Sequence, residues 1–266
     1  MGPLYSVMRH ELDIFRPIIY LLNLPAKPNL CATMIDFILC NWTAWAPGLD
    51  SKDDRLMEPG NAALPGCVSK MLKRRLTPLA RAVFIVAEPC VESGEVRPVV
   101  FSSAHGEICK SLEMLKTIQT GNELSPTAFS LSVHNAIAGL YSIAYGNSEE
   151  ITVVAPGQEG IAPAFIEALG MLHEGVDEVL IILYDEPIAD FYPIAPFNLN
   201  APFPCVIALR IALSGDGLPL QLSRGAQSRY DGEHAVQLLA FIRFLLAEDR
   251  SLSLGNQEHS WTWNKR

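Results

Sequence analysis

Two short apolar segments separated by one amphipathic stretch constrain the fold of this chain more than any other feature. Residues 151–155 and 179–184 are rich in β-branched and apolar side chains, which is typical of buried strands. Between them, residues 161–173 repeat apolar side chains at helical spacing. A strand, a helix and a second strand in this order favour a right-handed crossover within one sheet. We therefore predict an α/β fold, with a mixed sheet and helices on its faces.

The same patterns extend this prediction along most of the chain. The five prolines between residues 187 and 204 indicate a long irregular connection. Further strands are expected at residues 35–42, 99–103 and 205–213, and further helices at 107–119, 135–145 and 235–246, with another that starts near Pro78.

Residues 1–33 do not share this regular pattern. Pro25 and Pro28 interrupt a weakly amphipathic stretch, and Met34 follows directly before the first clean strand. We interpret residues 1–33 as an N-terminal extension or as the result of a start codon assigned too early, with a short docking helix as the alternative. Residues 34–266 are expected to form one domain, a size that one hydrophobic core can support.

The charge balance and the metal-binding residue types exclude several functions. The 29 acidic and 20 basic residues give a net charge of −9, whereas nucleic acids and anionic membranes are bound through an excess of Lys and Arg. No apolar run reaches the roughly 18 residues that a membrane span needs. Six cysteines without a CxxC pair and six histidines without HxxxH or HExxH spacing predict free thiols and no metal or other cofactor. We expect a cytoplasmic protein.

One basic cluster stands out against this acidic background. Its spacing mostly fits one flank of a helix, which is the pattern of a solvated surface. The functional alternative is a docking patch for an acidic partner. The cluster consists of Lys70, Lys73, Arg74, Arg75 and Arg81.

Residues 125–185 carry an ordered series of short motifs. An Asn-x-x-Ala-Gly helix is followed by a Tyr-Gly turn, a strand, a second helix, an acidic-Gly turn and another strand. The motif residues are Asn135, Ala138 and Gly139, then Tyr145-Gly146, and then Glu174-Gly175. This order resembles the first half of a beta-ketoacyl synthase of the thiolase superfamily, in which a nucleophile elbow follows the first of these strands.

The resemblance implies that the catalytic cysteine of the family has been lost. Counting forward from Asn135 or back from Gly175 places the family's cysteine position on Gln158. A thiol at a helix N-terminus is favoured as thiolate by the unpaired backbone N–H groups and the macrodipole, whereas an amide cannot become a nucleophile. The His-Gly-Thr and Phe-Gly-Gly motifs of the family's second half are also absent after Gly175. We therefore expect no catalytic residue, and no enzyme activity from this chain by itself.

Further motifs resemble one branch of that family, the short ketosynthase-like chain length factors of aryl polyene clusters. The resemblance implies a truncated thiolase-like fold that pairs with a cysteine-bearing beta-ketoacyl synthase and works with an acyl carrier protein. The basic residues Lys70, Lys73, Arg74 and Arg75 are then the expected carrier-protein docking site. The motifs are Trp42, Trp45 and residues 46–48, residues 71–76, 101–103 and 105–107, residues 124–127, and the pair Trp261 and Trp263.

The resemblance also implies where the partner subunit and the acyl tunnel meet this chain. Helix capping by His134 and Asn135, and simple packing by Gln158, are the structural alternatives to this role. The implied interface and tunnel residues are Ser132, Val133, His134, Asn135, Ala136, Ile151, Thr152, Val153, Val154, Ala155 and Gln158.

Two other functions remain open from the sequence. Some relatives with Gln at the cysteine position are linked to decarboxylation of malonyl carrier proteins, and a stand-alone module that binds an acyl chain or a carrier protein is the third possibility. The stretch from His105 to Glu107 follows a strand and opens a helix, but no Ser or Cys nucleophile is identifiable near it. We expect Trp261 and Trp263 to cover the core or a subunit contact.

Overall fold

The computed structural model describes residues 34–49, 52–60, 62–91, 95–157, 159–187, 203–225, 234–255 and 260–266. The proposed N-terminal extension, most of the proline-rich connection and Gln158 lie outside the described residues. None of the helices in the described ranges has the length and apolar character needed to cross a bilayer.

The described strands form one mixed sheet of eight, in the order β3-β2-β4-β5-β1-β6-β8-β7. The strands β3, β2 and β4 run parallel, and the remaining pairs are antiparallel. The sequence patterns missed β6, an eight-residue strand, and β7, a five-residue strand. The bounds are β1 Met34–Trp45, β2 Val99–Ser102, β3 Ile151–Val154, β4 Glu178–Asp185, β5 Cys205–Ala212, β6 Leu218–Gly225, β7 Ser251–Gly255 and β8 Ser260–Lys265.

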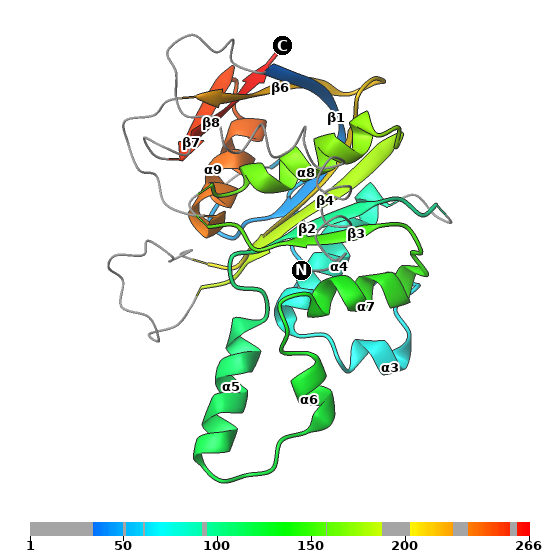
Figure 1. Ribbon diagram of the computed structural model, residues 1–266, viewed down its shortest axis with the longest axis vertical. Coiled ribbons are helices and arrows are strands. Elements are labelled where there is room, and N and C mark those ends of the chain that lie inside the picture. The colour runs from blue at the N-terminus through cyan, green and yellow to red at the C-terminus, as the bar shows by residue number, and fades with distance from the viewer. Residues whose placement is uncertain are drawn as a thin grey trace, which may run out of the picture. The chain divides into compact units, whose positions relative to one another are not determined.

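Helices cover both faces of this sheet, as Figure 1 shows. The helices α8 (Ala162–His173) and α9 (His234–Leu246) lie on one face, and α4 (Pro78–Ala87) and α7 (Ala136–Tyr145) on the other. The remaining described elements are α3 (Lys70–Lys73), a 3-10 turn (Glu88–Cys90), α5 (Ile108–Gln119) and α6 (Pro126–Ser130). The α/β mixed sheet with helices on its faces, predicted from the sequence, is confirmed.

The strand β4 divides the core into two layers. Val179, Ile181 and Leu183 pack with α8 and α9, whereas the alternate residues Leu180, Ile182 and Tyr184 pack with α4 and α7. All six of these side chains are fully buried. A strand that is apolar at every position is typical of the interior of a parallel sheet with helices on both sides.

An aromatic cluster joins the N-terminal and C-terminal parts of the domain. The Phe165 ring of α8 lies 6.0 Å from Phe37, 5.3 Å from Phe241 and 5.6 Å from Trp263, measured between ring centroids. Trp261 and Trp263 are both buried in this layer of the core. Their expected role in covering the core is confirmed.

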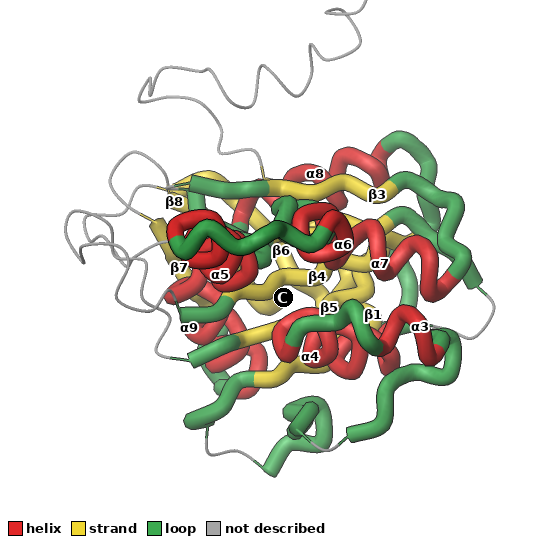
Figure 2. Tube along the Cα trace, turned by 90° about the horizontal axis from the view of Figure 1, so that it is seen from below, coloured by secondary structure: helices red, strands yellow, loops and turns green. Residues whose placement is uncertain are grey.

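The helix α5 differs from the sequence expectation in its surroundings. The helix has an apolar stripe at the predicted spacing, but none of its residues is buried. It packs with α6 to form a hairpin of helices, residues 108–130, that stands away from the sheet (Figure 1). Figure 2, seen from below, shows α5 and α6 side by side. The apolar period predicts the helix correctly, while the surface that covers its stripe is not found among the described residues.

The strand β3 also differs from the sequence expectation. Residues 151–155 are expected to be buried, but β3 is half-buried and Ala155 is exposed. The physical reason is that β3 lies at the edge of the sheet and pairs only with β2 among the described strands.

We predict that Phe165→Ala destabilises the domain by about 3–5 kcal/mol, because it removes the ring at the centre of the aromatic cluster and leaves a cavity. Urea unfolding followed by circular dichroism measures the change. Leu213→Ala, at a side chain that is 41% exposed, serves as the control and should change the free energy of unfolding by less than about 0.5 kcal/mol. Equal effects of the two substitutions would contradict this account of the core.

Candidate functional site

The carboxyl ends of the three parallel strands define the candidate site. In open α/β sheets, ligands bind at this edge. Ser103 follows β2, residues 155–157 follow β3, and Asp185 ends β4. Gln158, the residue at the expected nucleophile position, is outside the described residues, but its neighbours Gly157 and Glu159 are described.

The turn between β3 and α8 is closed by a side chain from α9. Gly160 has a left-handed φ of 60° and donates its backbone N–H to the carbonyl oxygen of Gly157 at 3.1 Å. Ile161, the residue before α8, donates its backbone N–H to Oε1 of Gln237 at 3.2 Å. A Cβ atom at Gly160 would lie 1.8 Å from the same oxygen, so glycine is required there. The Gln237 amide therefore occupies the space in front of the N-terminus of α8.

A second contact fastens the same turn from the C-terminal strand. The indole nitrogen Nε1 of Trp261 donates to Oε2 of Glu159 at 2.5 Å. Trp261 and Gln237 are both buried, and both come from the part of the chain after residue 230. The turn is thus held by an amide and an indole of the same chain.

The end of β2 is held by the buried carboxylate of Asp185. Its Oδ1 accepts from Oγ of Ser103 at 2.7 Å, and its Oδ2 accepts from the backbone N–H of Ala104 at 3.1 Å. The Ser103 hydroxyl oxygen in turn accepts from the backbone N–H of Gly106 at 2.7 Å. These bonds satisfy the polar groups of the tight turn that leads from β2 into α5, and they give Asp185 a structural role.

The Cys109 thiol near the start of α5 is poorly suited to act as a nucleophile. Burial, together with the neighbouring carboxyl groups of Glu186, Glu107 and Glu113, raises the pKa of Cys109 to about 12. Its thiolate form is therefore scarce at neutral pH, and a thiol is a poor nucleophile.

Glu107 is also an acid with a perturbed pKa. Its side chain is buried and its Oε1 accepts from Oγ1 of Thr77 at 2.9 Å. Burial raises the pKa of Glu107 to about 7, with a smaller contribution from the nearby Glu186. The sequence pattern of residues 105–107, which follow a strand and open a helix, does not predict this burial.

The segment 132–136 lies at the root of the α5–α6 hairpin. The His134 ring nitrogen Nε2 lies 2.8 Å from the carbonyl oxygen of Ser103, and the carbonyl oxygen of Ser132 accepts from Oγ of Ser111 at 3.0 Å. Val133 is 44% exposed, Ala136 is buried, and Asn135 makes no side-chain capping bond. The capping alternative for Asn135 is wrong, because the helix begins there without a side-chain acceptor.

Exposed apolar side chains of this region were not identified as site residues from the sequence. Those on the hairpin are Leu115, Ile118 and Phe129, and Ile143 lies on α7. The signal was present in the apolar stripe of residues 107–119, but helical spacing alone does not tell whether a stripe faces the core of the same chain.

Lys70, Lys73, Arg74 and Arg75 of the basic cluster are exposed and Arg81 is half-buried, but the cluster does not form one helix flank. The helix α3 ends at Lys73, so Arg74 and Arg75 lie on the turn after it, while Arg81 lies on α4. Met71, which is 70% exposed, lies among these cations.

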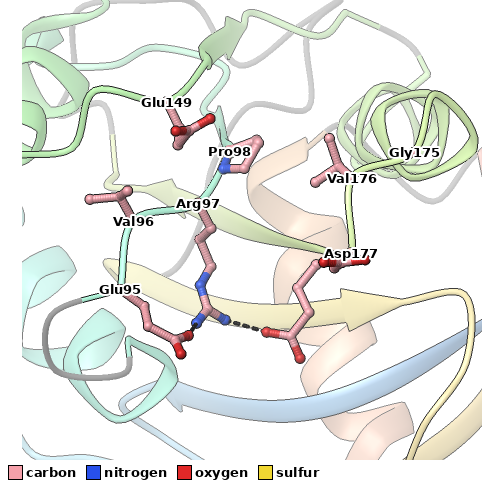
Figure 3. A pocket seen from close by; sticks show the side chains of 9 residues that line it. Glu95, Val96, Arg97, Pro98, Glu149, Gly175, Val176 and Asp177 are labelled. Atoms are coloured by element: carbon pink, nitrogen blue, oxygen red, sulfur yellow. Dashed lines mark hydrogen bonds and ion pairs between the residues drawn. The ribbon is translucent and has the colours of Figure 1, made fainter.

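A pocket of about 550 Å³ lies at the opposite edge of the sheet, before the strands β2, β3 and β4 (Figure 3). At its centre Arg97 forms ion pairs with Glu95 at 2.7 Å and Glu178 at 2.5 Å. Glu149 and Asp177 add two more carboxylates to the lining. This pocket is remote from the carboxyl-end site, and its acidic lining does not suit an acidic partner. The residues covered by the structure contain no His, Cys, Asp and Glu group arranged to hold a metal ion.

We predict that Asp185→Asn destabilises the domain by about 2–3 kcal/mol. The substitution replaces one carboxylate oxygen by an NH2 group, so Ser103 Oγ or the Ala104 N–H loses its acceptor. Asp216→Asn, at an exposed aspartate in the turn between β5 and β6, is the matched control and should be nearly neutral. Chemical unfolding of both variants measures the difference. A neutral Asp185→Asn substitution would contradict the structural role of this carboxylate.

Comparison with known proteins places the chain in a family. The structure is similar to that of the ketosynthase ApeO in complex with its chain length factor ApeC from Xenorhabdus doucetiae, with a TM-score of 0.66 and 23% identity over 86% of this chain and 99% of the matched chain. The ishigamide ketosynthase/chain length factor matches with a TM-score of 0.47 and 14% identity, over 65% of this chain and 54% of that chain. No curated protein matches the sequence.

The first of these similarities confirms the truncated thiolase-like fold that the sequence motifs predict. A family model described as "Beta-ketoacyl synthase, N-terminal domain" matches residues 42–264, which is most of the chain. The chain therefore belongs to the family of beta-ketoacyl synthase N-terminal domains.

Proposed function

We propose that this chain is a non-catalytic chain length factor that pairs with a cysteine-bearing beta-ketoacyl synthase and helps to shape its acyl tunnel. The observation that carries the proposal is the free edge of β3 beside an exposed apolar surface. We call this combined region, β3 with the exposed side chains of α5, α6 and α7, the pairing surface.

The backbone of β3 is suited to the addition of another strand. In β2, Val99 and Ser103 donate their N–H groups to the carbonyl oxygens of Glu150 and Val154. Because backbone groups alternate in direction along a parallel ladder, Ile151 and Val153 direct theirs to the free edge. An exposed edge of this kind is a template for pairing with a second chain.

The apolar part of the pairing surface adds to this edge. Leu115 is 55% exposed, Phe129 is 62% exposed and Ile143 is 70% exposed. Large apolar side chains gathered on neighbouring helices are typical of a protein–protein interface. A hairpin that contributes none of its side chains to the core is expected to gain its burial from a partner.

The site geometry supports a role without chemistry. Gln237 and Trp261 close the turn before α8, and the raised pKa of Cys109 disfavours its thiolate form at neutral pH. These two features support the pairing role.

The comparisons support the choice of partner. The similar structure is described as a ketosynthase in complex with its chain length factor. The match covers 86% of this chain and 99% of the matched chain, so the two chains have similar lengths. We propose the same kind of complex for this chain, in polyketide or fatty-acid-like biosynthesis of the aryl polyene type.

We expect the tagged chain to form a one-to-one complex with its ketosynthase when the two are co-expressed. Native mass spectrometry of the purified material measures the mass of the complex. Val153→Pro removes an N–H that β2 does not use, and Phe129→Asp places a charge on the pairing surface. Each should weaken the complex at least about tenfold, which corresponds to about 1.4 kcal/mol. Circular dichroism should show that both variants remain folded.

Leu213→Asp is the control, because Leu213 is an exposed apolar residue that follows β5. It lies at the end of the sheet where the parallel strands begin. The substitution should leave the complex intact. A soluble chain that never binds a ketosynthase would overturn the proposal and favour a stand-alone binding module. Release of carbon dioxide from malonyl carrier protein by the pure chain would favour the decarboxylase.

We further propose that the basic cluster around α3 docks an acyl carrier protein. Lys70, Lys73, Arg74 and Arg75 are exposed on one short helix and the turn that follows it. Exposed Met71 gives this cluster an apolar contact among the cations. Cations around an apolar side chain complement an acidic helix, and such charges act chiefly on association rate and specificity.

The double substitution Arg74→Glu and Arg75→Glu should weaken carrier-protein binding to the heterodimer at least about tenfold at low salt, and less at high salt. Surface plasmon resonance at two ionic strengths measures both effects. Arg250→Glu, an exposed arginine after α9 on the other face of the sheet, is the matched control. Equal loss with Arg250→Glu would show that net charge, and not this cluster, controls binding.

A further inference from the structure

The α5–α6 hairpin joins the body of the domain at a narrow root that contains a buried carboxyl group. Glu107 directly precedes α5, and its Oε1 accepts from Oγ1 of Thr77 at 2.9 Å. Thr77 is the N-cap of α4, where the same Oγ1 accepts from the backbone N–H of Ala80 at 3.0 Å. One carboxyl group therefore links the start of α5 to the start of a core helix.

The chain next to this carboxyl group has the geometry of a hinge. Gly106 has a left-handed φ of 56°. A Cβ atom at Gly106 would lie 3.1 Å from Cα and from the carbonyl oxygen of His134, on the segment that returns from the hairpin. The outgoing and returning segments are thus in close contact at Gly106 and His134, and a hydrogen bond from Ser111 to Ser132 joins them again. Neither helix of the hairpin contributes a buried residue.

The titratable groups around Glu107 include both acids and bases. Glu186, at the end of β4, acts on it by repulsion, and Lys110 of α5 is the cation that acts on it in the opposite direction. Glu107 in turn acts on Cys109 of α5 and Tyr184 of β4. The remaining titratable groups at the root are Asp185, His105 and His134.

This environment gives Glu107 a charge that changes in the neutral range. Burial raises its pKa from 4.5 to about 7 and the repulsion from Glu186 adds to this shift, while the hydrogen bond from Thr77 and the charge of Lys110 oppose it. Glu107 therefore binds a proton more tightly in the folded hairpin root than in the unfolded chain. Its contribution to the stability of the root is highest below about pH 4.5, falls as pH rises from about 4.5 to about 7, and stays lower above that range.

We propose that Glu107 is a proton-sensitive latch for the α5–α6 hairpin. In its neutral form the carboxyl group holds the hairpin root against α4. In its ionised form it is a buried charge beside Glu186, and the hairpin opens more often. The consequence for pairing rests on the proposed function, because the hairpin forms part of the pairing surface: association with the ketosynthase should then be stronger at pH 6 than at pH 8.

Hydrogen–deuterium exchange of the isolated chain, corrected for the intrinsic pH dependence of amide exchange, tests the latch without any partner. Peptides from residues 107–135 should exchange at least about fivefold faster at pH 8 than at pH 6, while peptides from β4 and β5 change little. Glu107→Gln keeps an acceptor for Thr77 and removes the titration, so its hairpin should exchange equally at both pH values. Glu123→Gln, an exposed glutamate on the same hairpin, is the matched control and should behave as the unaltered chain.

A hairpin with no pH dependence in the unaltered chain, or the same dependence in Glu107→Gln, would overturn the latch. Circular dichroism would reveal any loss of secondary structure in Glu107→Gln. In that case Thr77→Val, which removes the hydrogen bond but keeps the carboxyl group, provides the second test. The hairpin of Thr77→Val should exchange faster than that of the unaltered chain at both pH values. Because the experiment contains no ketosynthase, its failure leaves the pairing proposal intact. If exchange of the hairpin depends on pH but the chain binds no ketosynthase, only the pairing proposal is overturned.

Discussion

The central strand β4 is the constraint on which the rest of the domain depends. Its side chains from Val179 to Tyr184 are buried on both faces, so the helices α8 and α9 and the helices α4 and α7 must cover it from opposite sides. Burial of this apolar surface supplies the main driving force for the two layers. The same strand ends at Asp185, whose carboxylate holds the turn after β2. The core and the geometry of the candidate site are therefore set by one element.

The turn before α8 has become a joint between distant parts of the chain. Gln237 accepts from Ile161, and Trp261 donates to Glu159. These contacts bring the end of the chain against its middle, next to the aromatic cluster around Phe165. They hold α9 and β8 against the turn before α8.

The two ends of the parallel strands carry different surface features. The carboxyl ends of the parallel strands carry the hairpin root, and the edge strand β3 lies beside α7. The amino ends carry the acidic pocket around Arg97. This division explains why one region combines the free strand edge, the exposed apolar residues such as Phe129, and a carboxyl group whose charge changes near pH 7.

The sequence by itself determined most of the elements and the family, because period and motif order are local properties. The continuous apolar run of β4, the helical period of α8 and the spacing from Asn135 to Gly175 were sufficient for these. Only the tertiary structure decided what covers each element. The stripe on α5 has the same period as a core helix, yet it is exposed, and Gln237 reaches Ile161 across 76 positions. The burial of Glu107 likewise depends on α4 and β4, which no local pattern in residues 105–107 records.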